Sequence, residues 1–279
     1  MKKFTKIMLI LAGALATIGV VCVVVAFGMG LKTSSLLQIV KDGHFSFDTK
    51  GFHIFVGEDF EGDSQDENFE VTEPFQDLDI EFGAGELEVY YADVANVEVK
   101  ESGISNLRVD VRENTLVIRE KTKGNININM DDLNDRSLVV LIPNGMKLRE
   151  VDLEIGAATA DITDLLADGI SITVGAGKAD VSNITSRQIE IEVGAGELNA
   201  SQILTDELSV EAGLGQVNID LNGVQEEYNY SVECGVGKVQ VGEFSYSGLG
   251  TEKYIKNAGA TKRIEIECGI GEVIVNFQK

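Results

Sequence analysis

A 19-residue unit occurs three times in succession over residues 153–209, and it constrains the fold of this chain more than any other feature. Each copy has two apolar residues around a polar one, then Gly-Ala-Gly or a close relative, then a second apolar pair and a polar turn. Because one such unit cannot bury its apolar side alone, we expect neighbouring copies to stack around a shared core. Seven copies are found, and the middle residues of their corners are Ala84, Ala157, Ala176, Ala195, Leu214, Val236 and Ile270.

The apolar phase of the repeat slips by one residue at each Gly-x-Gly. Ile191 and Val193 share one face of a strand, whereas Leu198 and Ala200 are the apolar positions after the glycines. A bulge or corner at 194–196 explains the slip, with glycine supplying unusual φ values and the small middle residue packed into the bend. The sequence therefore predicts an all-β domain, a parallel β-helix or related solenoid with about 19 residues per coil. An antiparallel β-sandwich is the alternative, because other strands separate the first copy from the second.

The domain organisation follows from where this pattern begins. We expect a cytoplasmic tail at 1–6, a transmembrane signal-anchor helix at 7–30, a stalk with an acidic linker at 31–74 and the repeat domain at 75–279. Residues 93–150 are expected to supply inserted strands or a cap.

The apolar stretch at 7–30 contains no charge and is long enough to span a bilayer. Lys2, Lys3 and Lys6 precede it, so the positive-inside rule places the N-terminus in the cytoplasm and the C-terminal domain outside the cell. The expected location is the cell membrane, crossed once, with the lipid bilayer as a partner.

The chain is strongly acidic, with 46 Asp and Glu against 23 Lys and Arg and a net charge of −23. Such a surface repels nucleic acid, which is therefore not an expected partner. Divalent cations and basic protein surfaces are compatible with it. The simplest interpretation is that the charge keeps the domain soluble.

An outward column of carboxylates is the most specific surface feature that the repeats predict. Stacked coils would place these side chains about 5 Å from their neighbours. A solvated face is one interpretation, and a stripe that binds a divalent cation or a basic partner is the other. The candidate ligands are Glu154, Glu192, Glu211, Glu233 and Glu267.

Cys234 and Cys268 occupy equivalent positions before two corners, so they are expected in adjacent coils as a candidate disulfide or as small buried hydrophobes. No catalytic set and no cofactor-binding motif emerge. The histidines, His44 and His53, lie outside the repeats. Each Gly-x-Gly runs into another strand, whereas a nucleotide-binding loop must open a helix.

Three segments, DLDIEFGAGELEV, SLVVLIPNG and VGAGKADVSNI, resemble the bacterial "putative adhesin" family, a domain of unknown function in Gram-positive envelopes. The resemblance covers about 75–277. It implies a solenoid displayed outside the membrane, and it brings no catalytic residues to this sequence.

Three functions are therefore considered. The first is a non-catalytic, adhesin-like interaction scaffold that binds an envelope or surface protein or a glycan. The second is an accessory protein of an envelope-stress regulatory system that acts through a membrane partner. A polysaccharide-active enzyme is the third, and it rests on fold analogy alone.

Overall fold

The structure is a computed structural model in which an all-β domain follows a short antiparallel pair, β1 (His44–Asp48) and β2 (Gly51–Phe55). Within the described residues, no helix is long and apolar enough to cross a bilayer. The expected anchor at 7–30 lies outside the described residues. Apart from the backbone of β1 and β2, the described residues are 67–104, 107–120, 136–247 and 250–278.

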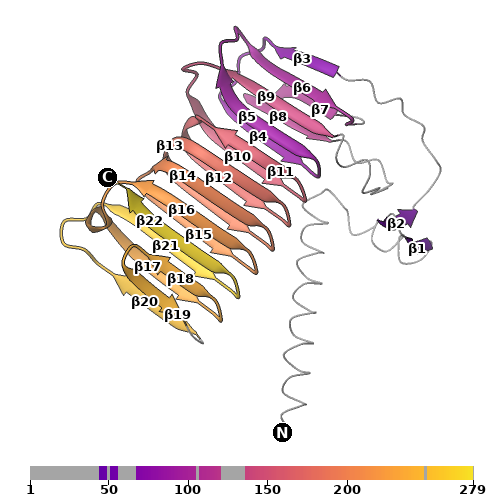
Figure 1. The fold of residues 1–279 in the computed structure, drawn as a ribbon. Helices are drawn as coiled ribbons and strands as arrows, with labels where there is room; N and C mark the ends of the chain where they lie inside the picture. The colour runs from indigo at the N-terminus through magenta and orange to yellow at the C-terminus, as the bar shows by residue number, and fades with distance from the viewer. Residues whose placement is uncertain are drawn as a thin grey trace.

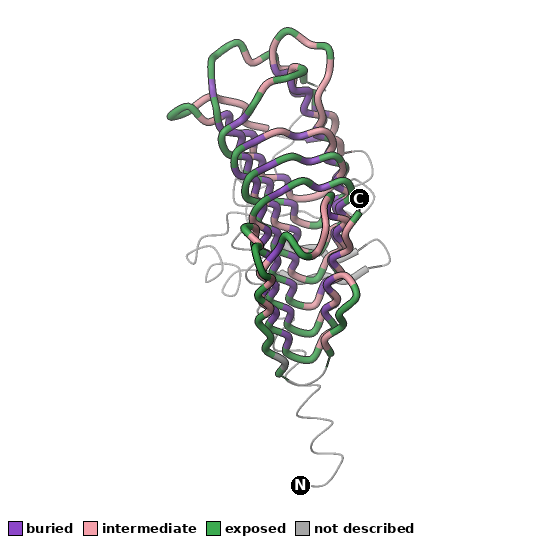
Figure 2. Tube along the Cα trace, turned by 90° about the vertical axis from the view of Figure 1, so that its left-hand side faces the viewer, coloured by how far each residue is buried: buried purple, intermediate pink, exposed green. Residues whose placement is uncertain are grey.

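Two sheets face each other across one hydrophobic core and are joined along an edge by the Gly-x-Gly corners (Figures 1 and 2). Sheet A holds the strands that precede the corners. Its order is β7 (Leu107–Arg112), β8 (Thr115–Glu120), β4 (Asp77–Phe82), β10 (Leu148–Ile155), β12 (Leu166–Val174), the second half of β13 (Lys178–Val193), β15 (Glu207–Ala212), β21 (Lys262–Cys268), β17 (Tyr228–Cys234) and β20 (Thr251–Ile255).

Sheet B holds the strands that follow the corners. Its order is β3 (Glu67–Val71), β6 (Val97–Ser102), β9 (Ser137–Pro143), β5 (Glu86–Ala92), β11 (Thr159–Thr163), the first half of β13, β14 (Glu197–Leu204), β16 (Gln216–Asn222), β22 (Glu272–Gln278), β18 (Lys238–Val241) and β19 (Phe244–Ser247).

The central coils pair in parallel with a constant register. Ile172 lies opposite Ile191, and Ile191 lies opposite Val210, a step of one 19-residue unit each time. Buried and more exposed positions alternate along both sheets, as expected for strands with one face in the core (Figure 2). The all-β solenoid is confirmed, and these parallel registers contradict the antiparallel sandwich.

The second glycine of a corner is needed because the backbones of adjacent coils approach closely. A Cβ on Gly177 would lie 2.1 Å from the carbonyl oxygen of Ala158, and one on Gly196 would lie 2.4 Å from that of Gly177. The Ala158 oxygen also accepts a hydrogen bond from the Lys178 amide at 2.9 Å, which holds the coils together. Among the corner glycines of the seven copies, only Gly85 has a positive φ. The expectation that each corner needs an unusual φ is wrong.

At both ends of the solenoid, the order of coils departs from the order of the chain. β21 lies between β15 and β17, and β22 lies between β16 and β18, so the last coil of the sequence fills an internal position (Figure 1). β19 and β20 then close this end by antiparallel pairing. At the other end, β8 and β9 lie against β4 and β5, and β6 and β7 lie outside them, again antiparallel.

Candidate functional site: the acidic outer face of sheet A

The outward column predicted from the repeats lies on the outer face of sheet A. Reading from the N-terminal end, the register partners are Glu81, Glu154, Thr173, Glu192, Glu211, Glu267, Glu233 and Glu252. A second acidic column runs two residues earlier on the same face and includes Asp79, Asp152, Glu190 and Glu265. Sequence reasoning missed Glu252 and this second column, although period-2 alternation before each corner could have indicated the latter.

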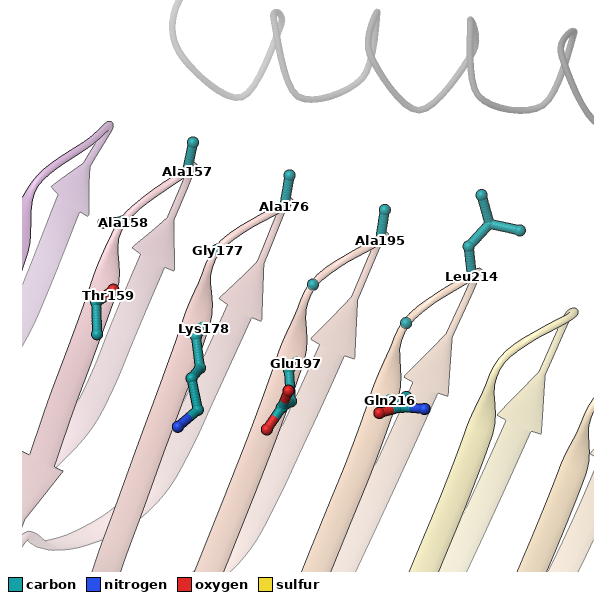
Figure 3. Close-up of a pocket in the computed structure, with 12 residues that line it drawn as sticks. Ala157, Ala158, Thr159, Ala176, Gly177, Lys178, Ala195, Glu197, Leu214 and Gln216 are labelled. Atoms are coloured by element: carbon teal, nitrogen blue, oxygen red, sulfur yellow. The ribbon is translucent and has the colours of Figure 1, made fainter. Parts of the chain in front are cut away.

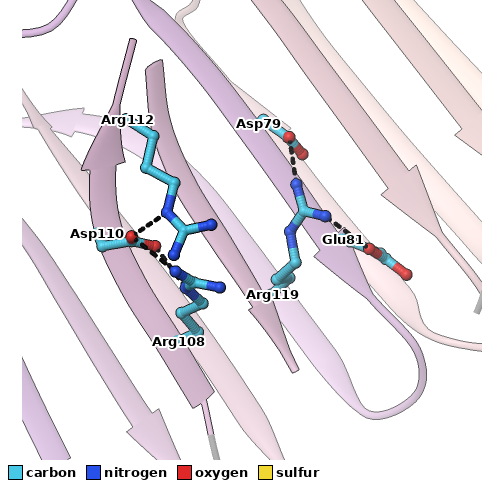
Figure 4. Close-up of polar contacts among 6 residues, drawn as sticks. All are labelled: Asp79, Glu81, Arg108, Asp110, Arg112 and Arg119. Atoms are coloured by element: carbon cyan, nitrogen blue, oxygen red, sulfur yellow. Dashed lines mark hydrogen bonds and ion pairs between the residues drawn. The ribbon is translucent and has the colours of Figure 1, made fainter. Parts of the chain in front are cut away.

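Arginine side chains compensate the carboxylates at the N-terminal end of this face (Figure 4). Arg119 donates a hydrogen bond from Nη2 to Asp79 Oδ2 at 2.8 Å, and its Nη1 lies 3.9 Å from Glu81 Oε2. On the neighbouring strand, Asp110 is held by two further arginines. The first carboxylates of the face are therefore partly neutralised.

One coil further on, burial and neighbouring carboxylates together raise the pKa of two acidic side chains. Burial, and then the charges of Glu81 and Asp152, raise the pKa of Glu154 above its ordinary value of 4.5. Burial, and then the charge of Asp79, raises the pKa of Asp152 above 3.8. These carboxylates therefore hold a proton more readily in the folded chain than in the unfolded one, mainly because they are partly buried and secondly because other carboxylates lie nearby.

Among the residues that the structure describes, no cation pairs with the rest of the column. Five glutamates of this column follow one another on adjacent strands without interruption, and we call them the acidic ladder: Glu192, Glu211, Glu267, Glu233 and Glu252. No ion pair or hydrogen bond joins any of these side chains to another residue that the structure describes. With strands about 4.8 Å apart, they form a regular row of negative charge whose repulsion solvent only partly screens.

The central coils on the outer face of sheet B are different, because their polar side chains pair with one another. Lys178 Nζ donates to Asp180 Oδ2 at 2.8 Å, and Asn199 Nδ2 donates to Asp180 Oδ1 at 3.1 Å. Asn218 Nδ2 donates in turn to Asn199 Oδ1 at 2.9 Å, so amides and carboxylates continue from coil to coil. The polar side chains of these central coils are thus paired, in contrast with the acidic ladder on sheet A.

A groove of about 510 Å³ runs beside the acidic ladder at the last corners. Four ladder carboxylates line it, and Ala212, Cys268 and Cys234 contribute to it together with corner glycines. Because glycine has no side chain, the backbone there stays open to solvent. A second hollow of about 630 Å³ follows the earlier corners (Figure 3).

The middle residues of the corners form an outward row. Figure 3 shows the side chains of Ala157, Ala176, Ala195 and Leu214 pointing away from the strands in one line. The expectation that this residue packs into the bend is wrong. At the next two corners the row continues with Ile270, 51% exposed, and Val236, 59% exposed. We call the three large members of the row, Leu214, Ile270 and Val236, the apolar ridge.

Cys234 and Cys268 are register partners on β17 and β21, and both are buried free thiols. Burial, followed by the neighbouring Cys234, raises the pKa of Cys268 to about 11. The thiol is therefore protonated and poorly nucleophilic near neutral pH. A disulfide between these residues remains a prediction.

The structure brings four of the five predicted cation ligands onto consecutive strands. Thr173 separates the fifth, Glu154, from them. The described residues contain no group of three or more His, Cys, Asp or Glu placed to hold a metal ion.

The fold and this face define a capped, two-sheet parallel β-solenoid with one strongly acidic side. Residues 180–242, from β13 to just past β18, match the family model described as the N-terminal domain of toast_rack, DUF2154. The resemblance to a domain-of-unknown-function family is thus confirmed over this part of the chain. No curated protein matched the sequence.

The solved structures that match include proteins described as a putative cell adhesion protein from Clostridium sporogenes and a putative adhesin from Bacteroides fragilis. Each is 14% identical in sequence to this chain. The first comparison covers 77% of this chain and 100% of the other, with a TM-score of 0.42. The second covers 76% and 96%, with a TM-score of 0.44.

Proposed function

We propose that this chain is a non-catalytic binding scaffold, anchored in a bacterial cytoplasmic membrane by residues 7–30 and displaying its solenoid outside the cell. The observation that carries the binding role is the contrast between the two faces. The central coils of sheet B pair polar side chains with one another, whereas sheet A leaves five consecutive carboxylates without a partner among the described residues. Since like charges in register cost stability, such a row is best explained by a cationic partner.

The anchoring and the location are supported by the sequence. Residues 7–30 are uncharged, and the three lysines before them favour a cytoplasmic N-terminus. The repeats contain no histidine, and the two cysteines of the repeats are buried. The proposal therefore assigns recognition to the solenoid and no reaction.

Photo-crosslinking in living cells tests this function. A photoreactive amino acid replaces Glu192 on the acidic ladder in one strain and Glu88 on the outer face of sheet B in a control strain. A C-terminal epitope tag is digested in intact cells to check which side of the membrane it occupies. We expect a discrete adduct from the first position alone and a tag that protease removes. A protected tag, or identical adducts from both positions, would refute the proposal.

The nature of the adduct separates two roles of the scaffold. An adduct with a membrane protein would indicate an accessory of a regulatory system, the second function considered above. Adducts with external material would indicate adhesion.

A further inference from the structure

The groove beside the acidic ladder is lined by carboxylates, and the apolar ridge lies next to it, just beyond its lining residues. Its lining carboxylates, Glu211, Glu267, Glu233 and Glu252, come from four adjacent strands of sheet A. The apolar ridge stands three residues further along each coil, beyond the corner glycines. Val236 and Ile270 are each more than half exposed, although apolar side chains of this size are usually buried.

The ridge and the ladder are adjacent and parallel because both follow the stacking of the same coils. The Ile270 amide donates to the Gly213 carbonyl at 2.8 Å, and the Val236 amide donates to the Gly269 carbonyl at 2.8 Å. The corners of the fifth, seventh and sixth copies are thus consecutive along the solenoid. Three residues of chain separate Glu211 from Leu214, a span of about 10 Å at most.

We propose that this groove is the docking site for a cationic amphipathic helix of a partner protein, whose basic residues face the acidic ladder and whose apolar residues cover the apolar ridge. The inference rests on the proposed scaffold function and names the partner chemistry for the same face. A second copy of this chain is a poor occupant, because its net charge of −23 would be brought against another acidic surface.

The spacing favours a helix over an extended peptide. Five carboxylates on adjacent strands span about 19 Å, since each step is about 4.8 Å. Four helical turns advance about 22 Å, and flexible lysine side chains absorb the difference. An extended strand presents one side every second residue, so four such steps advance about 27 Å and lose register with the ladder.

Binding of a synthetic peptide tests the proposal. The probe is a lysine–leucine peptide of about five helical turns, with leucine on one face, and a scrambled peptide of equal composition is the control. The full-length protein is held in zwitterionic nanodiscs, with empty nanodiscs as the blank. We expect the helical peptide to bind at least several-fold more tightly than the scrambled one, and to weaken on the order of tenfold at high salt.

Three variants locate the binding. The ladder variant carries Glu211→Gln, Glu233→Gln and Glu267→Gln, and its affinity should fall on the order of tenfold with a shallower salt dependence. The ridge variant carries Val236→Thr and Ile270→Thr, and its affinity should fall several-fold with an unchanged salt dependence. The control variant removes the same number of charges from sheet B. Its substitutions are Glu86→Gln, Glu88→Gln and Asp161→Asn.

Equal losses in the ladder and control variants would overturn the inference, since binding would then follow net charge alone. An unchanged affinity in the ridge variant would also overturn it. Neither result concerns membrane location or partners in cells, so failure of the peptide test is distinguishable from failure of the crosslinking test above.

Discussion

Replacing Gly177 by alanine tests whether close approach of the coils dictates the corner glycines. The new Cβ would lie 2.1 Å from the Ala158 carbonyl oxygen and 2.8 Å from its nitrogen, both backbone atoms that cannot rotate away. Relieving such overpacking costs about 1–3 kcal/mol. Loss of the hydrogen bond from the Lys178 amide to the same oxygen costs about 1 kcal/mol. Alanine reduces the conformational entropy of the unfolded chain, which stabilises the folded state by about 0.4–1 kcal/mol. The expected net decrease in the free energy of unfolding is therefore about 2 kcal/mol.

Gly83→Ala is the matched control, since this glycine opens the corresponding corner of the first copy. The nearest atom to its added Cβ would be Glu120 Oε1, at 4.0 Å, and its φ is not positive. We expect unchanged or slightly higher stability. Urea unfolding of the full-length protein, followed by circular dichroism, gives the midpoints. Hydrogen exchange at the Lys178 amide reports the local effect, which matters because repeat proteins can open coil by coil. Equal midpoints and equal exchange in the two variants would refute the close-approach argument.

Three further changes probe other parts of the fold. Burial and neighbouring carboxylates raise the pKa of Glu154 in the folded chain, so the folded chain binds more protons than the unfolded one and its stability falls as pH rises above 4.5. Glu154→Gln should therefore raise the urea midpoint at neutral pH and reduce the increase in midpoint that acidification produces. The hydrogen bond from Arg149 lowers the pKa of Asp77, so the stabilisation that this pair gives the folded chain is present above pH 3.8 and is lost as pH falls. Arg149→Ala should therefore lower the urea midpoint at neutral pH. A decrease in midpoint of the same size in strong acid would contradict this cause. Oxidised glutathione should accept two electrons from the thiols of Cys234 and Cys268 and form their disulfide, with a mass loss of about 2 Da that Cys234→Ala abolishes. Closing a loop of about 33 residues should stabilise the chain by about 4 kcal/mol, and an unchanged mass after prolonged oxidation at alkaline pH would contradict the pairing.

The parts of the fold that the sequence could predict are those with a local signal. The slip in apolar phase across 194–196 indicated a corner, and the structure joins two sheets there. Alternation around Glu192 and Glu211 placed those side chains outside, and both are exposed. The predicted reason for the glycines was wrong. A Cβ at the corner would clash with Ala158 in the preceding coil, and the sequence of the corner itself carries no sign of that contact.

The order of the coils could not be predicted either, because it depends on pairing between residues far apart in the chain. Glu211 and Glu233 belong to consecutive copies, yet Glu267 lies between them. The position of Arg119 beside Glu81 likewise depends on the inserted strand β8. The extent of the unpaired ladder was therefore visible only in three dimensions.

The internal position of β21 and β22 has a consequence for biosynthesis. A solenoid whose coils follow the chain can assemble progressively as it emerges from the ribosome, each coil settling on the one before. Here β17 and β18 are synthesised before the strands that connect them to β15 and β16. The coils from β17 onward therefore cannot reach their final form until β21 and β22 have been synthesised, and a chain that stops before residue 262 carries two open sheet edges. Such truncated products are expected to aggregate or to be degraded, because unpaired strand edges promote association.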